Sequence, residues 1–304
     1  MSKHVLLVSY SQTGQLSRLC DSFVRDLAAA DDIHVERLVL QPERPFAFPW
    51  RFMDFFNTFP ETVHLRPAPN RPFSLARERY DLVIIAYTVW FLSPAQPITA
   101  FLQSAQAAKV LRHTPVVTLI GCRNMWLMAQ EKTKKLLKKA EARLIGNVVK
   151  IDQCSSATSF ITTPLWMLTG RKKAASWLPE AGISEAEIED AARFGRRIAE
   201  RLRSGGPLDE TLLQGMGAVK VNEKLILSER FAHRSFYLWG KLIMAAGRRS
   251  PLLRRAMVAF YVVFLIAIIL TVVPASALLK RLLAPLMRDK IRHEKAYYSW
   301  PSGE

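Results

Sequence analysis

The first two-thirds of the chain alternate between short apolar runs and segments with helical spacing of apolar residues. Five apolar runs predict buried β-strands, at residues 4–9, 33–40, 81–87, 115–121 and 143–152. The segments with helical spacing predict helices at residues 15–29, 94–102, 125–140 and 183–203. Continuous apolar strands separated by helices are typical of a parallel sheet covered on both faces. The pattern therefore predicts a doubly wound α/β domain.

Two segments interrupt this alternation, and each follows a predicted strand. Residues 41–73 contain seven prolines and eight Phe or Trp residues, and residues 153–180 begin polar and become apolar. The aromatic side chains form either an additional packed layer or the wall of a pocket for an apolar substrate. On the second interpretation, five side chains are expected to line the substrate pocket: Trp50, Phe55, Phe56, Trp126 and Trp166.

The C-terminal third contains the most hydrophobic segment of the protein. Residues 256–279 form a run of 24 without a charge. As a helix this run would be about 36 Å long, enough to cross a hydrocarbon core of about 30 Å, with a kink expected at Pro274. A buried core helix is the alternative. The net charge of +17 calls for an anionic partner, either nucleic acid or a membrane. Nine basic and two acidic residues in 219–255 directly precede the apolar run, which favours the membrane over nucleic acid.

These patterns divide the chain into four parts. We predict an α/β domain over residues 1–204 with insertions at 41–80 and 153–184, a basic linker and juxtamembrane helix over 205–255, a membrane helix over 256–279 and a basic tail over 280–304. The first ten residues do not resemble a signal sequence. The three cysteines make neither a disulfide framework nor a zinc motif, so no metal site is expected. We therefore expect the domain to face the cytosol at the cytoplasmic membrane.

The strongest chemical signal follows the first predicted strand. A loop rich in hydroxyl groups, Ser9-Tyr10-Ser11-Gln12-Thr13-Gly14-Gln15, directly precedes a helix. Backbone N–H groups, hydroxyls and the helix dipole together favour a bound phosphate. The loop matches neither the P-loop nor the GxGxxG pattern, and a helix N-cap without a ligand is the alternative reading.

Two further loops, Thr88-Val89-Trp90-Phe91-Leu92-Ser93-Pro94 and Gly121-Cys122-Arg123-Asn124-Met125-Trp126, follow the third and fourth strands. Together the three loops resemble those of the flavodoxin-like family, which binds FMN on a five-stranded sheet of order 2-1-3-4-5. The resemblance implies that the phosphate is bound by Ser9, Ser11, Gln12, Thr13, Gly14 and Gln15. It also implies that Thr88, Val89, Trp90 and Phe91 lie along the flavin, with Gly121, Cys122, Arg123 and Asn124 near its ring edge. Leu16 departs from the family, which often has Thr there.

Longer strings, among them PFAFPW, YTVWFLSPAQPITAFL, CRNMWLMAQEK and SFITTPLWMLTG, resemble the flavodoxin-like proteins of dialkylresorcinol biosynthesis. Database names often label these proteins condensing enzymes. The resemblance implies an FMN-dependent aromatase that dehydrogenates a dialkyl-cyclohexane-1,3-dione to a dialkylresorcinol. A ketosynthase-like protein would be its pathway partner.

Three other readings stay open: a direct condensing activity, a membrane-anchored electron-transfer or quinone-reducing flavoprotein, and a flavodoxin-like scaffold without flavin. Condensation needs an activated cysteine, and Arg123 beside Cys122 could lower the pKa of that thiol. Dehydrogenation needs a base, for which His64 is preferred over His113, Asp54 and Glu61. A homodimer is also considered.

Overall fold

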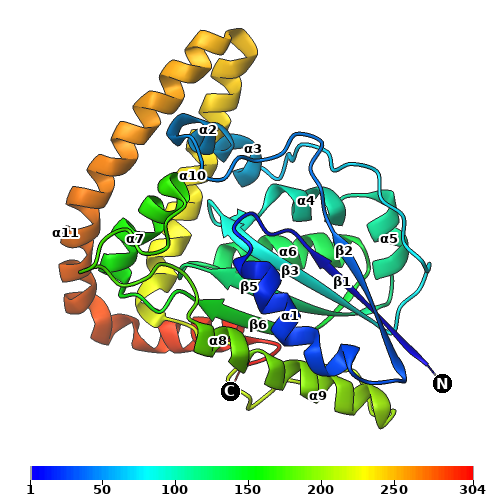
Figure 1. Cartoon of the computed structure of the whole chain (residues 1–304). Coiled ribbons are helices and arrows are strands. Elements are labelled where there is room, and N and C mark those ends of the chain that lie inside the picture. The colour runs from blue at the N-terminus through cyan, green and yellow to red at the C-terminus, as the bar shows by residue number, and fades with distance from the viewer. Residues whose placement is uncertain (1, 304) are drawn as a thin grey trace.

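The computed structural model describes residues 2–303, apart from the side chains of residues 156, 157, 273, 274 and 276–286. A sheet of six strands lies at its centre (Figure 1). The strands are β1 (Lys3–Ser9), β2 (Ile33–Val39), β3 (Leu82–Trp90), β4 (Ser93–Pro94), β5 (Pro115–Cys122) and β6 (Arg143–Ile151). The order is β2-β1-β3-β5-β6 with parallel pairing, and β4 pairs antiparallel with the end of β3. The α/β fold with a parallel sheet is confirmed, but the sheet has one strand more than expected, because residues 93–94 turn back onto β3.

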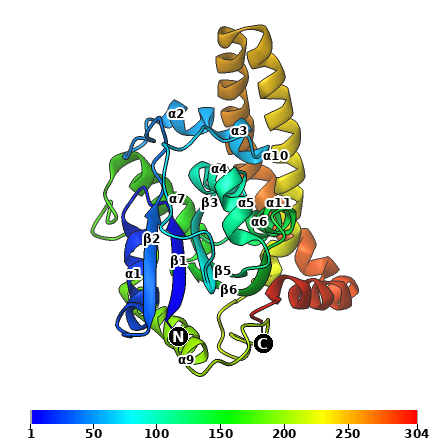
Figure 2. The ribbon, with the colours of Figure 1, turned by 90° about the vertical axis from the view of Figure 1, so that its right-hand side faces the viewer.

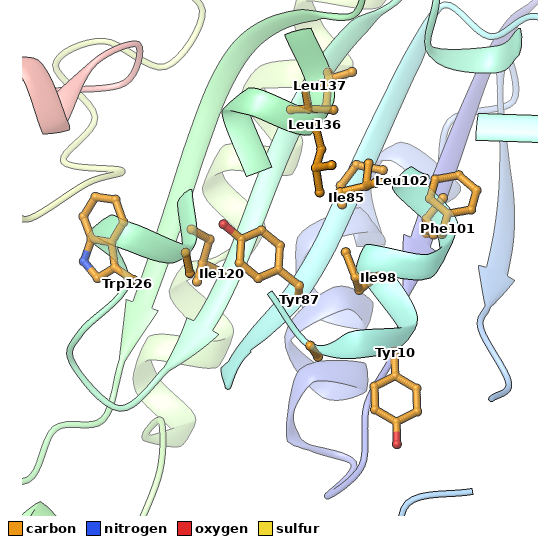
Figure 3. Close-up of a cluster of buried hydrophobic side chains, with 14 of the residues drawn as sticks. Tyr10, Ile85, Tyr87, Ile98, Phe101, Leu102, Ile120, Trp126, Leu136 and Leu137 are labelled. Atoms are coloured by element: carbon orange, nitrogen blue, oxygen red, sulfur yellow. The ribbon is translucent and has the colours of Figure 1, made fainter. Parts of the chain in front are cut away.

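Alternate residues of the central strands face opposite sides of the sheet, as the pleat requires. In β1, Leu6 and Val8 belong to one apolar core, whereas Val5 and Leu7 belong to the other. Figure 3 shows part of the first core, in which the Tyr87 ring lies near Ile120. The continuous apolar strands of the sequence are therefore buried on both faces.

Helices from both sides cover these two faces. One face carries α1 (Gln15–Ala28), α8 (Glu185–Asp190) and α9 (Ala192–Arg203), and the other carries α4 (Gln96–Leu102), α5 (Ala105–Leu111) and α6 (Leu127–Lys139). The single helix expected over 183–203 is wrong. The chain divides into α8 and α9 at Ala191, where hydrogen bonds between residues three apart replace the α-helical ones.

The two insertions contain helices and contact each other. The first contains α2 (Phe52–Asn57) and α3 (Phe59–Val63), and the second contains α7 (Ser156–Thr169). The Trp50 backbone N–H donates to the Met167 carbonyl at 2.8 Å. The rings of Phe48 and Trp166 meet edge to face with centroids 6.4 Å apart.

The C-terminal part forms two long antiparallel helices, α10 (Glu223–Arg249) and α11 (Pro251–Ser299). Figure 2 shows them side by side, reaching past the α/β domain. The stretch Pro251–Val272 of α11 is long and apolar enough to cross a membrane, and only 17% of its most apolar window is buried. The kink expected at Pro274 lies outside the described side chains.

Residues beyond 204 also enter the cores of the α/β domain. Leu213 and Ala218 pack in the core beneath α1, and Tyr298 packs in the other core. The Ser302 hydroxyl accepts a hydrogen bond from the Asn147 N–H of β6 at 2.7 Å. Side chains on both sides of residue 204 therefore share the same cores. The domain boundary expected at residue 204 stays a prediction.

Candidate functional site

Four parallel strands end beside one another at one edge of the sheet. The register places Ser9 beside Ala86, Thr88 beside Gly121, and Cys122 beside Ile151. A cavity of about 170 Å³ lies at this edge. The sequence-predicted cofactor residues that line it are Gln12, Thr13 and Gln15 after β1, Thr88, Val89, Trp90 and Phe91 at the end of β3, and Gly121, Cys122 and Arg123 at the end of β5. The three predicted loops thus converge, as expected at the carboxyl ends of an open α/β sheet.

The loop after β1 presents one buried polar group that has no partner among the described residues. The Ser11 hydroxyl oxygen is buried, and no hydrogen-bond partner for it exists among the described residues. Gly14 begins α1 with φ of 80°, and no atom lies within 4 Å of the place that a Cβ would occupy there. Thr13 Oγ1 accepts from the Gln15 N–H at 3.4 Å. A buried hydroxyl without a partner is costly, so this loop fits an anion that the Ser11 hydroxyl could reach.

Aromatic rings form one wall of the cavity. The rings of Trp50 and Trp90 have centroids 5.7 Å apart and meet nearly at right angles. Gln12 ties the first insertion to the loop after β1, because it accepts from Trp50 Nε1 at 2.9 Å and donates to the Ala47 carbonyl at 2.7 Å. The insertion is thereby held over the cavity.

The turn after β3 has an uncommon backbone. Phe91 and Leu92 have φ values of 48° and 56°, a region that bulky residues rarely adopt. The antiparallel pairing of Ser93 with Trp90 closes this turn and holds both residues there. Phe91 consequently lines the cavity on one side and contacts Phe59 of α3 on the other, with ring centroids 5.1 Å apart.

Asp152 is a site residue that the sequence reasoning missed. It directly follows β6 and supplies the one carboxylate lining the cavity within the described part of the chain. Its Oδ2 accepts from the Gly182 N–H at 2.8 Å, and its Oδ1 accepts from the Cys154 N–H at 2.7 Å. The sequence did contain a signal for it, because Asp152 is the last residue of the strand predicted at 143–152, and the carboxyl ends of such strands are where ligands bind.

Arg123 lines the same cavity as Asp152. Its guanidinium lies 4.0 Å from the centroid of the Phe160 ring. Burial lowers the pKa of Arg123, and the Asp152 charge opposes that effect. The cavity therefore contains one cation and one carboxylate among mainly apolar and aromatic walls.

Several predicted residues lie outside the cavity lining. Ser9, Ser11, Gly14 and Asn124 belong to the loops but do not line it. Trp126 is only 2% exposed and packs in the core beside α6 (Figure 3), so its expected place in the substrate pocket is corrected. Phe56 faces α11 instead of the cavity, because successive residues of a helix point about 100° apart and Phe55 takes the cavity side. Trp50, Phe55 and Trp166 do line it.

His64, the preferred base, is also placed elsewhere. Its Nε2 lies 3.0 Å from the Tyr237 carbonyl oxygen of α10, and burial lowers the pKa of its imidazole. Glu61 is paired with Arg254, and His113 lies before β5, at the opposite end of the sheet from the cavity. Asp54 is exposed on α2 and does not line the cavity. None of the four bases considered from the sequence reaches the cavity.

The cysteines do not have the character of nucleophiles. Burial raises the pKa of the Cys122 thiol more than Arg123 lowers it, and burial raises the pKa of Cys20 to about 12. The expected activation of Cys122 by Arg123 is thus outweighed by desolvation. Because the thiolate is the reactive form, this environment disfavours a condensing reaction at either cysteine.

Glu229 of α10 contacts the chain directly after the loop of residues 121–126. Its Oε1 accepts from the Met128 N–H at 2.7 Å, at the start of α6 and directly after the 121–126 loop. The side chain is fully buried, its Oε2 has no partner among the described residues, and burial raises its pKa to about 8. Helix α10 is therefore linked to the loop that lines the cavity.

This environment predicts a pH-dependent contribution of Glu229 to stability. The folded-state pKa lies above the unfolded value of about 4.3, so the contribution is complete below that value and is lost as the pH rises through about 8. We expect the free energy of unfolding of Glu229→Gln, relative to wild type, to increase by up to about 1.4 kcal/mol per pH unit between pH 5 and 8. Urea unfolding of both proteins across this range measures the difference, and Glu43→Gln, at an exposed position, is the control. A difference that does not change with pH would show that Glu229 is not desolvated in the folded protein.

No group of three or more His, Cys, Asp or Glu side chains suited to a metal ion occurs in the part of the chain that the structure describes. No protein-family model and no curated protein matches the chain. Among solved structures, a flavoprotein from Lactobacillus acidophilus NCFM in complex with FMN is 15% identical, with a TM-score of 0.39, and the match covers 49% of this chain and 93% of that one. The Trp repressor binding protein from Bacillus subtilis is 13% identical, with a TM-score of 0.32, covering 63% of this chain and 98% of that one.

Proposed function

We propose that the chain is a flavoprotein that binds one FMN at the carboxyl ends of β1, β3 and β5. The observation that carries this proposal is the buried Ser11 hydroxyl, which has no partner among the described residues and lies in the loop that leads into the N-terminus of α1. A phosphate there would accept from the hydroxyl and meet the positive end of the helix dipole. Trp90 and Phe91 offer flat apolar surfaces to a ring system in the adjoining cavity.

The size of the cavity adds an expectation. Its volume of about 170 Å³ is smaller than the roughly 300–1,000 Å³ typical of ligand sites. The cavity, which Trp50 and Trp166 of the two insertions help to line, is therefore expected to widen when FMN binds. Titration of the flavin-free protein with FMN should give saturable one-to-one binding and a change in tryptophan fluorescence, and purified protein should show flavin absorbance. Absence of both signals would overturn the proposal.

We further propose an oxidoreductase of the aromatase type, acting on a dialkyl-cyclohexane-1,3-dione. The apolar walls suit alkyl chains, and the two insertions that build these walls have no evident use in a bare electron carrier. Bound FMN would supply a hydride acceptor. The chain itself has to orient the dione, exclude water and accept a proton, after which loss of hydride and proton leaves a ring that tautomerises to the resorcinol.

For the proton acceptor we assign Asp152 in place of His64. Asp152 lines the cavity, and its two backbone N–H donors fix its orientation, whereas His64 is held against α10. We expect Asp152→Asn to keep FMN and to slow anaerobic reduction of the flavin by a dialkylcyclohexanedione about 100-fold or more. His64→Gln is the matched control and should react at the wild-type rate.

Stopped-flow absorbance of the flavin band measures this rate, and FMN titration of each variant separates loss of the base from loss of the site. If the flavin of His64→Gln were reduced slowly and that of Asp152→Asn at the wild-type rate, His64 would be the base instead. Failure of the dione to reduce the wild-type flavin, with rapid reduction by a nicotinamide or quinol donor, would favour the electron-transfer reading instead.

The cellular setting of this proposal is the cytoplasmic membrane, with the flavin domain in the cytosol, because a product with two alkyl chains partitions into lipid. A ketosynthase-like protein would supply the dione. The apolar stretch Pro251–Val272 and the basic residues around it support contact with membrane lipid. A homodimer remains a separate expectation.

A further inference from the structure

The α10–α11 hairpin, defined here as residues 223–299, has one side packed on the domain and, among its described side chains, another side that is exposed. Toward the domain, Ile243 of α10 and Val258 and Tyr261 of α11 are buried against Phe59 of α3. The Tyr261 and Phe59 rings stack with centroids 4.4 Å apart. This packing leaves the other side of each helix available for contact with a partner.

The opposite side of the hairpin is apolar and exposed. On α11, Phe260, Val263 and Leu270 are 59%, 67% and 70% exposed, and on α10 Leu238 and Leu242 are also exposed. The α11 positions recur at intervals of three and seven, so they form a stripe along one face of the helix. Large exposed side chains in this density mark an interaction surface.

The charge around this surface has a single sign. Residues 230–288 contain no Asp or Glu. Exposed cations within the hairpin include Arg234, Lys241, Arg248, Arg249 and Arg255. An apolar stripe bordered by cations complements the headgroups and acyl chains of an anionic bilayer, whereas a second copy of the same basic face would repel it.

Contacts near the two ends of α11 favour an arrangement in which the helix does not cross such a bilayer. Near its start, Arg254 donates from Nη1 to Glu61 Oε1 at 2.8 Å, and Glu61 lies on α3 of the domain. Beyond the apolar stretch, Tyr297 donates to Glu131 Oε2 of α6 at 2.8 Å, and Glu294 pairs with Arg230. A helix that crossed the membrane would place Arg254 and Tyr297 on opposite sides, yet both are bound to the same domain.

We propose that the α10–α11 hairpin is a monotopic membrane-binding element that lies in the interface of an anionic bilayer without crossing it. The exposed stripe of α11 enters the headgroup region, and the surrounding cations contact anionic lipid. The expected transmembrane helix over 256–279 is replaced by a helix parallel to the surface. This inference stands on the hairpin alone and does not depend on flavin binding.

Flotation of the full-length protein with vesicles tests the surface. Vesicles of phosphatidylcholine and phosphatidylglycerol, about three to one, should bind the protein, and phosphatidylcholine alone should bind it more weakly. The double variant Phe260→Glu with Val263→Glu should lose binding about tenfold or more. Leu242→Glu on α10 is a second test, and Val39→Glu is the matched control, since Val39 is 59% exposed at the far edge of the sheet.

Thermal unfolding of each variant shows that the fold is retained, as expected for exposed positions. Equal binding by the double variant, with complete release of the wild type by high salt, would mean that cations alone hold the protein and would overturn the proposal. A stable dimer that Phe260→Glu dissociates, without vesicle binding, would also overturn it by assigning the stripe to a second copy.

Labelling of Arg292→Cys separates the monotopic arrangement from a crossing one. Arg292 is exposed in the part of α11 beyond the apolar stretch, which a crossing would carry to the other side of the bilayer. A membrane-impermeant maleimide should react with this cysteine from outside vesicles to which the protein has bound, and should not react when enclosed in the lumen. The variant without that cysteine gives the background from Cys20, Cys122 and Cys154. Reaction from the lumen would show that the hairpin crosses the bilayer.

Discussion

Replacement of both Ser11 and Thr13 by alanine is expected to weaken FMN binding about 100-fold or more. Each hydroxyl can donate one hydrogen bond to the phosphate, and hydrogen bonds to charged groups contribute about 1.5–3 kcal/mol each. Their combined loss of about 3 kcal/mol or more corresponds to about two powers of ten in the dissociation constant. Fluorescence titration with FMN measures the change.

The stability of the flavin-free Ser11→Ala protein is a second readout, which separates a role of Ser11 in phosphate binding from a role in holding the fold. The Ser11 hydroxyl is buried without a partner, so Ser11→Ala removes an unsatisfied group from the flavin-free protein. We expect the unliganded Ser11→Ala protein to be at least as stable as wild type, although it binds FMN less tightly. Ser17→Ala, at an exposed position on α1, is the control and should change neither quantity. Wild-type FMN affinity in the double variant would refute the phosphate assignment.

Substitution of Gly195 by alanine is expected to destabilise the fold by about 3 kcal/mol or more. Gly195 lies in α9 where this helix crosses α1, and a Cβ built there would be 1.7 Å from the Phe23 carbonyl oxygen. Because the obstacle is backbone, the two helices must separate. Helix propensity alone predicts the opposite sign, since alanine favours a helix interior by about 1 kcal/mol over glycine.

Urea unfolding of Gly195→Ala measures this loss, and Gly247→Ala in α10 is the matched control. The nearest atom to a Cβ at Gly247 is Arg254 Cδ at 3.2 Å, part of a flexible side chain, so the control should be neutral or slightly stabilising. If the two variants had the same stability, the close approach of α1 and α9 would be wrong. Since α1 begins at the proposed phosphate loop, Gly195→Ala should also weaken FMN binding.

The sequence predicted the site to the level of loops, and only part of it to the level of side chains. The loops after three strands converge because parallel strands place their carboxyl ends at one edge, which the apolar runs alone imply. Local spacing could not separate Phe55, which lines the cavity, from Phe56, which faces α11. It also could not place Trp126, which follows the third loop but is buried beside α6.

The sequence by itself determined the properties that depend on residues close together in the chain. These are the period of the strands and helices, the hydroxyl-rich turn at residues 9–15, and the apolar, uncharged run in the C-terminal third. Such signals arise from backbone geometry and hydrophobicity within one element, so they need no knowledge of the partner.

Only the tertiary structure decided which distant groups meet. Asp152 lies at the cavity because Gly182, 30 residues away, donates to its carboxylate, and His64 is kept from the cavity by a contact with α10 173 residues away. The apolar helix is long enough to cross a membrane, and the contacts of Arg254 and Tyr297 with the same domain are the basis of the proposal that it does not cross. Length and hydrophobicity are local properties, whereas the side of a membrane on which each end lies is set by contacts between residues far apart in the chain.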